Sequence, residues 1–191
     1  MVEGIQSAIK AYAEINHRCP RQIIIYRDGM GGTSMVDKCE RIEVPTVLEA
    51  IRNYSGSMKD ANVTYCFVNQ KLNQRLFVKN NGNYINAGAG TVVDTQIVKT
   101  QEESRFDFYL VPHSATVATA LPVHFDVKYN DCQFDKQAFE TLTYHLCYNY
   151  FNFAGGIKVP NVVKYAEKLA NYSVDVRGIP NGKLNKNLHF L

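Results

Sequence analysis

The feature that most constrains the fold is an apolar run that ends in an acidic residue and a glycine. Residues 23–29 read IIIYRDG: three β-branched residues, a tyrosine, a charged pair and a turn-forming glycine. Such a run is typical of a buried parallel strand. In an α/β sheet, side chains at the carboxyl ends of parallel strands form the edge where ligands bind. Asp28 is therefore the first candidate for chemistry.

The composition predicts one globular domain over residues 1–191. The chain is 46% hydrophobic and 20% charged, which is enough to bury a core. Its five cysteines are odd in number and scattered, so they indicate neither a disulfide framework nor a zinc site. We expect a reducing compartment, cytoplasmic or nuclear, and no membrane. The net charge of +3 permits nucleic-acid binding without indicating it by itself.

Helical and strand patterns alternate along the chain and predict an α/β fold. We expect the Asn- and Gly-rich segment 80–90 to be a surface loop. The expected helices cover residues 2–15, 36–54 with an interruption or restart at Pro45, 134–153 and 162–172. The expected strands cover residues 23–29, 62–69, 91–98, 106–111 and 122–129, with a short apolar piece at 76–78.

Seven segments, in order and at matching distances, resemble the C-terminal half of the PIWI domain of the Argonaute/Piwi family. The resemblance runs from about Arg21 to Ala170, and the end of the chain, Asn187 to Leu191, favours the Piwi branch. No single segment is decisive, but coincidence across seven is improbable. The segments are YRDG (26–29), QKLNQRLF (70–77), GTVVD (90–94), DFYLVPH (107–113), PVHFDV (122–127), LTYHLCYNY (142–150) and VPNVVKYA (159–166).

The resemblance implies an RNase H-like fold and, in active members, cleavage of RNA paired to a small guide by two divalent metal ions, Mg²⁺ or Mn²⁺. Two-metal cleavage needs several converging carboxylates. The family's first two carboxylates lie well upstream of the YRDG aspartate, whereas the 27 residues before Asp28 read as a helix. We therefore expect the opening strands to be missing and this chain to show no metal-dependent RNA cleavage.

Three positions match metal-binding positions of the family. Asp28 matches the third catalytic position, and Glu167 occupies the fourth, which is usually His or Asp. In the Piwi branch the terminal carboxylate, here that of Leu191, helps to hold a Mg²⁺ beside the guide's 5′ phosphate, in a pocket shared with the MID domain. The alternatives are that Asp28 caps the following loop, that Glu167 is a solvated surface charge, and that the tail is flexible.

Six further positions match those that contact the guide strand in the family. Cations in loops would neutralise phosphates without reading bases, which suits a protein that leaves sequence recognition to its guide. The alternative is an ordinary solvated surface. The six residues are Lys71, Arg75, His113, Tyr150, Lys158 and Lys164.

Two departures from the family pattern lie before the strand at 122–129. Ala118 stands where the family usually has Gly, and Leu121 stands where it often has Arg, so some guide contact is expected to be weakened there. Asp107 and His124, both in expected strands, are interpreted as structural.

Two functions from different classes follow. The first is the PIWI portion of a Piwi-type silencing protein that grips a small guide RNA and its complementary target, with MID and PAZ portions as partners. Slicing would then require the upstream Asp and Glu in the full protein. The second is a non-catalytic α/β protein-interaction module derived from a PIWI domain. Salt-dependent RNA affinity separates them, because phosphate contacts weaken steeply as salt rises.

Overall fold

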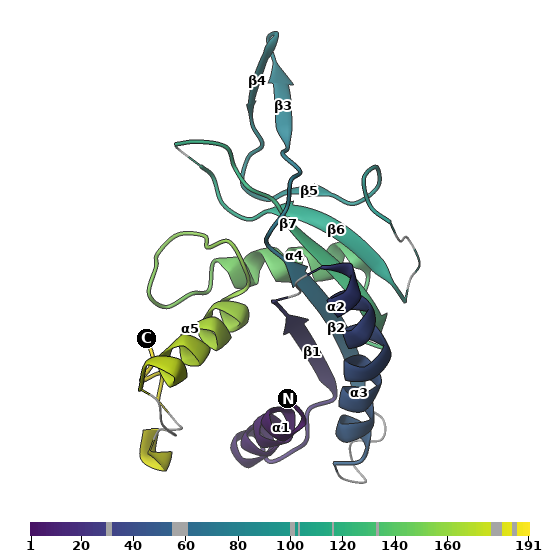
Figure 1. Cartoon of the computed structure of the whole chain (residues 1–191), viewed down its shortest axis with the longest axis vertical. Helices are drawn as coiled ribbons and strands as arrows, with labels where there is room; N and C mark the ends of the chain where they lie inside the picture. Colours follow the sequence, from purple (N-terminus) through teal and green to yellow (C-terminus); the bar gives the residue numbers. More distant parts are fainter. Residues whose placement is uncertain are drawn as a thin grey trace. The chain divides into compact units, whose positions relative to one another are not determined.

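The computed structural model describes residues 1–29, 32–54, 61–99, 102, 104–115, 117–132, 134–176, 181–184 and 187–191. Its elements confirm a mixed α/β fold with a five-stranded sheet of order β1-β2-β7-β6-β5 and a separate β3-β4 ribbon (Figure 1). The strands are β1 (Gln22–Arg27), β2 (Asn62–Asn69), β3 (Phe77–Asn80), β4 (Asn83–Asn86), β5 (Thr91–Val93), β6 (Phe106–Val111) and β7 (Val123–Asn130). The helices are α1 (Val2–Asn16), α2 (Thr33–Lys38), the π-helix η1 (Cys39–Glu43), α3 (Val44–Arg52), α4 (Lys136–Cys147), α5 (Asn161–Val176) and the 3₁₀ turn η3 (Gly182–Leu184).

The chain divides into two compact units that alternate along the sequence. The first unit contains residues 1–69, 94–108 and 124–136, and the second contains residues 70–93, 109–123 and 137–191. Because each unit is assembled from three separate stretches, no single point in the sequence divides them. The prediction of one domain over residues 1–191 stays a prediction.

In the first unit, β1 and β2 run parallel and share one apolar face. Their register pairs Ile23 with Val63 and Ile25 with Tyr65. Side chains alternate between the two faces of a strand, so these residues lie on one side of the sheet. There they pack with Ile9 of α1 and Ile51 of α3. No strand precedes β1 in the described part of the chain, and α1 occupies that stretch, as expected from its pattern.

An aromatic cluster supports the other side of this sheet. The ring of Phe125 on β7 stacks on Phe108 of β6 with centroids 5.1 Å apart, and Tyr26 meets Phe125 edge-on at 6.4 Å. Phe108 and Phe125 have no solvent exposure. Asp107 and His124, their neighbours in sequence, form a buried pair with 2.8 Å between Oδ2 and Nε2. This pair supports the structural interpretation of both residues.

The helical region after β1 changes pitch instead of restarting. The N–H of Val44 donates to the carbonyl of Cys39, five residues earlier, which makes residues 39–43 a π turn between α2 and α3. Pro45 lies in the first turn of α3, directly after the π turn, and has no N–H to donate to the preceding turn. The expected interruption at Pro45 is thus a local widening of one continuous helical segment.

Four predicted segments between residues 80 and 176 differ clearly from the observed elements. The expected loop at 80–90 is wrong, because residues 83–86 form β4 and pair with β3. The helix predicted over 134–153 ends at Cys147, and the strand predicted over 91–98 ends at Val93. The last helix instead extends to Val176, beyond the predicted end at Tyr172. In the part of the chain that the structure describes, no helix is both long and apolar enough to cross a membrane.

Candidate nucleic-acid interface

All six residues matched to guide contacts belong to the second unit, and one hydrogen bond joins two of the loops that carry them. The half-buried Lys158, between α4 and α5, donates from Nζ to the carbonyl of Gln70 at 3.0 Å. Gln70 directly precedes Lys71 at the start of the loop between β2 and β3. This bond joins segments that are 88 residues apart in sequence. It brings the loop that carries Lys158 next to the loop that carries Lys71.

The loop between β2 and β3 is shaped by Arg75. Its Nη1 donates to the carbonyls of Leu72 at 2.9 Å and Gln74 at 2.8 Å, which closes a tight turn around the side chain. Lys71 and Arg75 are both exposed. The loop thus exposes both cations to solvent, and the hydrogen bonds of Arg75 hold its backbone in this shape.

The start of α5 carries two of the predicted site residues on one side of the helix. Lys164 forms an ion pair with Glu167, with Nζ and Oε2 2.9 Å apart. Glu167 is exposed and lies one helical turn after Lys164. Glu167, predicted as the fourth catalytic position, is therefore an acidic partner of a predicted guide-contacting lysine. Such an exposed i,i+3 pair contributes only about 0.3–0.5 kcal/mol, so it can open at little cost.

Tyr150 lies in a packed aromatic corner. Its side chain is 8% exposed, and its ring lies 5.3 Å from that of Tyr165. The hydroxyl of Tyr165 accepts a hydrogen bond from the N–H of Phe151 at 3.1 Å. A hollow of about 470 Å³ opens beside this corner and is also lined by Leu188. Tyr150 thus supports the shape of this surface and exposes little of its own ring.

His113 has an unusual environment. It is half-buried, and its Nδ1 atom is shielded from solvent without a hydrogen-bond partner among the described residues. An unpaired buried ring nitrogen costs about 1–3 kcal/mol. The expectation that His113 lies near guide phosphates stays a prediction, and direct contact through Nδ1 requires the side chain to move.

Asp28 follows β1 and is held at the start of the next loop. Its Oδ1 accepts the N–H of Gly29 at 2.7 Å, which is the loop-capping arrangement. The preceding Arg27 donates through Nη1 to the Asp28 carbonyl. Gly29 has a φ of 84°, which glycine adopts without strain. The capping interaction uses one carboxylate oxygen, and metal ligation by Asp28 stays a prediction.

The described residues do not make up a complete divalent-metal site. Among them, no group of three or more His, Cys, Asp or Glu side chains lies close enough to hold an ion. Asp28 belongs to the first unit, whereas Glu167 and Leu191 belong to the second. At the end of the chain, the N–H of Leu191 donates to the Leu188 carbonyl at 3.2 Å. Two-metal chemistry needs more carboxylates than these positions supply.

Sequence reasoning missed Asn86, which anchors the β3-β4 ribbon and belongs to no motif. Its Nδ2 donates to the carbonyl of Ala118 at 2.8 Å, and its Oδ1 accepts the N–H of Ala120 at 3.1 Å. Ala118 has a φ of 68°, in the left-handed region that favours glycine. The usual glycine of the family would adopt this backbone without strain, so the departure at Ala118 places a Cβ in an unfavourable conformation.

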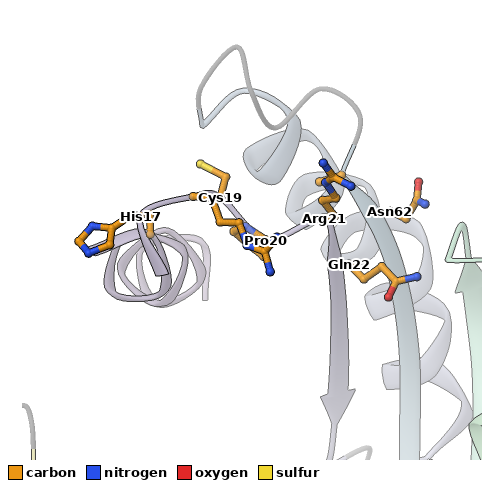
Figure 2. Close-up of a pocket in the computed structure, with 9 residues that line it drawn as sticks. His17, Cys19, Pro20, Arg21, Gln22 and Asn62 are labelled. Carbon is orange, nitrogen blue, oxygen red and sulfur yellow. The ribbon is translucent and has the colours of Figure 1, made fainter. Parts of the chain in front are cut away.

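A larger hollow in the first unit is lined by none of the predicted site residues. It has a volume of about 1030 Å³ and runs along the connection from α1 to β1. Figure 2 shows the ring of His17 pointing away from Arg21, while Gln22 and Asn62 point to yet another side. Because these polar groups diverge, they do not form a site around one ligand.

Four of the cysteines are held as thiols. All five are free, and Cys39, Cys66, Cys132 and Cys147 are buried. Burial raises the pKa of Cys147 to about 12 and that of the Cys66 thiol well above its ordinary value. Thiolates are the reactive form, so neither of these two residues is suited to nucleophilic catalysis.

Comparisons with known proteins agree with the arrangement of these elements. The model of the Piwi domain family matches residues 1–175. Piwi-like protein 1 of Danio rerio is 30% identical over 98% of this chain, which spans about a fifth (21%) of that relative. The crystal structure of Drosophila Piwi superimposes with a TM-score of 0.86 at 30% identity, covering 99% of this chain and 26% of the other.

A more distant solved structure has the same fold. Kluyveromyces polysporus Argonaute with a guide RNA matches with a TM-score of 0.71 at 24% identity, covering 88% of this chain and 22% of that protein. These matches confirm the RNase H-like fold class expected from the sequence.

Proposed function

We propose, from the premise that this chain belongs to the Piwi domain family, that it is the guide-gripping portion of a larger Piwi-type protein in small-RNA-guided silencing. The observation that carries the proposal is the hydrogen bond from Lys158 to Gln70, which joins two loops with cationic residues. A solved Argonaute of the same fold was crystallised with a guide RNA, which supports this choice of ligand.

In this proposal the cations bind the phosphates of the guide. Lys71 and Arg75 offer ammonium and guanidinium donors from an exposed loop, and Lys158 adds a third cation beside it. Contacts of this kind are independent of base identity, so the target is selected by pairing with the guide. The complementary target RNA and the MID and PAZ portions of the longer protein complete the assembly.

Divalent metal ions are typical of this RNase H-like family. For this chain we propose that Asp28 and Glu167, with the carboxylate of Leu191 at the 5′-phosphate end, are partial contributions to Mg²⁺ or Mn²⁺ sites. These sites would be completed by carboxylates and MID residues of the intact protein. We place the working site in the cytoplasm or nucleus, where the five free thiols stay reduced.

Equilibrium binding of a 5′-phosphorylated short RNA tests the proposal. We expect the double variant Lys71→Ala/Arg75→Ala to lose about tenfold in affinity at moderate salt. The slope of log affinity against log salt should fall by about 1.4, since each single-strand phosphate contact contributes about 0.7. Lys158→Ala should weaken binding in the same direction.

The matched control removes two other exposed cations. Lys10→Ala/Lys38→Ala lowers the net charge equally but acts on α1 and α2, in the first unit. It should leave the affinity within about twofold and the slope unchanged. A loss of twofold or less in Lys71→Ala/Arg75→Ala, or equal losses in both double variants, would contradict the proposal. Salt-insensitive behaviour would favour the protein-interaction module instead.

A further inference from the structure

The β3-β4 ribbon exposes large apolar side chains that no part of the proposed grip uses. Phe77 is 50% exposed, Val78 46%, Tyr84 72% and Ile85 47%. Figure 1 shows this ribbon projecting without another described element of its unit alongside it. A two-stranded ribbon is only marginally stable by itself. Four exposed large apolar side chains on such a small element indicate a binding surface.

The register of the ribbon sorts these side chains onto two different faces. Phe77 pairs with Asn86, and Lys79 pairs with Tyr84. Residues directly opposite each other in an antiparallel pair share a face, and alternate residues along each strand do so too. One face therefore carries Phe77, Lys79 and Tyr84, which we call the aromatic-cationic face. The opposite face carries Val78 and Ile85, which pair directly.

The charge around the ribbon favours one class of ligand. Residues 70–93 contain three cations, Lys71, Arg75 and Lys79, and no aspartate or glutamate. The aromatic-cationic face is therefore the continuation of a positively charged segment. A polyanion with planar groups, which single-stranded RNA is, complements both its charge and its rings.

The ribbon is also held in a defined shape. Its turn, Asn81-Gly82, has φ values of 49° and 83°, as in the type I′ turns whose twist matches antiparallel strands. At the base, the two hydrogen bonds of Asn86 tie the ribbon to Ala118 and Ala120 of the second unit. A bond from the Ala87 N–H to the Leu76 carbonyl joins the two segments that flank the strands. Rings on such a support lose little freedom when a base stacks on them.

We propose that the aromatic-cationic face is a second contact for single-stranded RNA, with bases stacking on Phe77 and Tyr84 while Lys79 meets a neighbouring phosphate. The inference rests on the proposed function and extends it from phosphate neutralisation to base stacking. Stacking accepts every base, so this contact too is independent of sequence.

The ribbon supplies its own matched control. Phe77→Ala/Tyr84→Ala removes both rings of the aromatic-cationic face, whereas Val78→Ala/Ile85→Ala removes apolar side chains from the opposite face. With a 5′-phosphorylated 20-nucleotide RNA, we expect the first variant to lose about tenfold or more in affinity and the second to lose less than about twofold. Lys79→Ala should lower the salt slope by about 0.7.

An RNA of the same length with abasic sites isolates stacking from charge. The wild-type chain should bind it more weakly than normal RNA, and Phe77→Ala/Tyr84→Ala should bind both RNAs equally. Equal losses in the two ribbon variants, or an unchanged preference for normal RNA in Phe77→Ala/Tyr84→Ala, would overturn the inference. If Lys71→Ala/Arg75→Ala weakens RNA binding but Phe77→Ala/Tyr84→Ala leaves the affinity unchanged, only this inference fails. If the wild-type chain does not bind RNA, both proposals fail.

Discussion

Ala118 occupies a position where the family usually has glycine, and its backbone is strained. Its φ of 68° places a Cβ-bearing residue in a left-handed conformation, which costs about 1–2 kcal/mol for an ordinary L-residue. Its carbonyl accepts the bond from Asn86, so this conformation helps to hold the β3-β4 ribbon. The departure from the family glycine is visible in the sequence, whereas the strained backbone angle is visible only in the structure.

We predict that Ala118→Gly stabilises the chain. Glycine relieves the positive φ, although its larger unfolded-state entropy offsets part of the gain, so the net increase in the free energy of unfolding should be about 0.5–1 kcal/mol. Urea denaturation measures it. Ala154→Gly, in an exposed loop where φ is not positive, is the control and should bring no gain. A destabilised Ala118→Gly would show that the strain argument is wrong.

At the scale of elements, Glu43 links β1, the π turn and β2. Its carboxylate accepts hydrogen bonds from Arg27 at 2.8 Å, from the Tyr65 hydroxyl and from the Cys39 thiol at 3.4 Å. Burial raises the pKa of Glu43, but the hydrogen bonds from Tyr65 and Arg27 outweigh burial, and the pKa is lowered from its ordinary value of 4.5. Because Arg27 also donates to the Asp28 carbonyl, this cluster fixes the strand end that carries Asp28.

Because the pKa of Glu43 is lowered in the folded state, we predict that its contribution to the free energy of unfolding decreases at acidic pH. A carboxyl with a depressed folded pKa stabilises the fold above its unfolded value, near 4.5, and loses that contribution as pH falls through the folded value. Glu43→Gln should cost about 2 kcal/mol at pH 7, and the difference from wild type should shrink below pH 4. Denaturation at several pH values measures it. The control Glu49→Gln, on the exposed surface of α3, should leave the free energy of unfolding unchanged. If the stability loss of Glu43→Gln were the same at every pH, the lowered pKa of Glu43 would be wrong.

Elements with one dominant periodicity were predictable from the sequence, and those that depend on a competing signal were not. The prediction of a strand over 62–69 is confirmed by β2, whose residues form a nearly continuous apolar run that is buried from 63 to 68. The Asn and Gly residues of the segment 80–90 predict a loop, since both are typical loop residues. Asn81-Gly82 is instead a hairpin turn, and the flanking strands, with four residues each, are too short to show an alternating pattern. The π turn at 39–43 has no sequence signal of its own.

At the scale of the whole molecule, the chain spans about a fifth (21%) of the curated relative, and its candidate roles divide between its two units. The residues matched to guide contacts all lie in the second unit, and Lys158 and Gln70 bring two of their loops together. The sequence could identify these residues only through the family resemblance, since isolated lysines in loops carry no pattern of their own. Asp28 and Glu167 lie in different units, and their joint role as metal ligands stays a prediction.

The most direct test of the central claim is to map where RNA touches the chain. A 5′-phosphorylated RNA carrying photoreactive uridines would be crosslinked to the 191-residue protein, and the modified peptides identified by mass spectrometry. The account predicts crosslinks in residues 70–86 and 148–165, competed away by unlabelled RNA and weakened by rising salt. Crosslinks confined to residues 1–69, or none that compete, would contradict it.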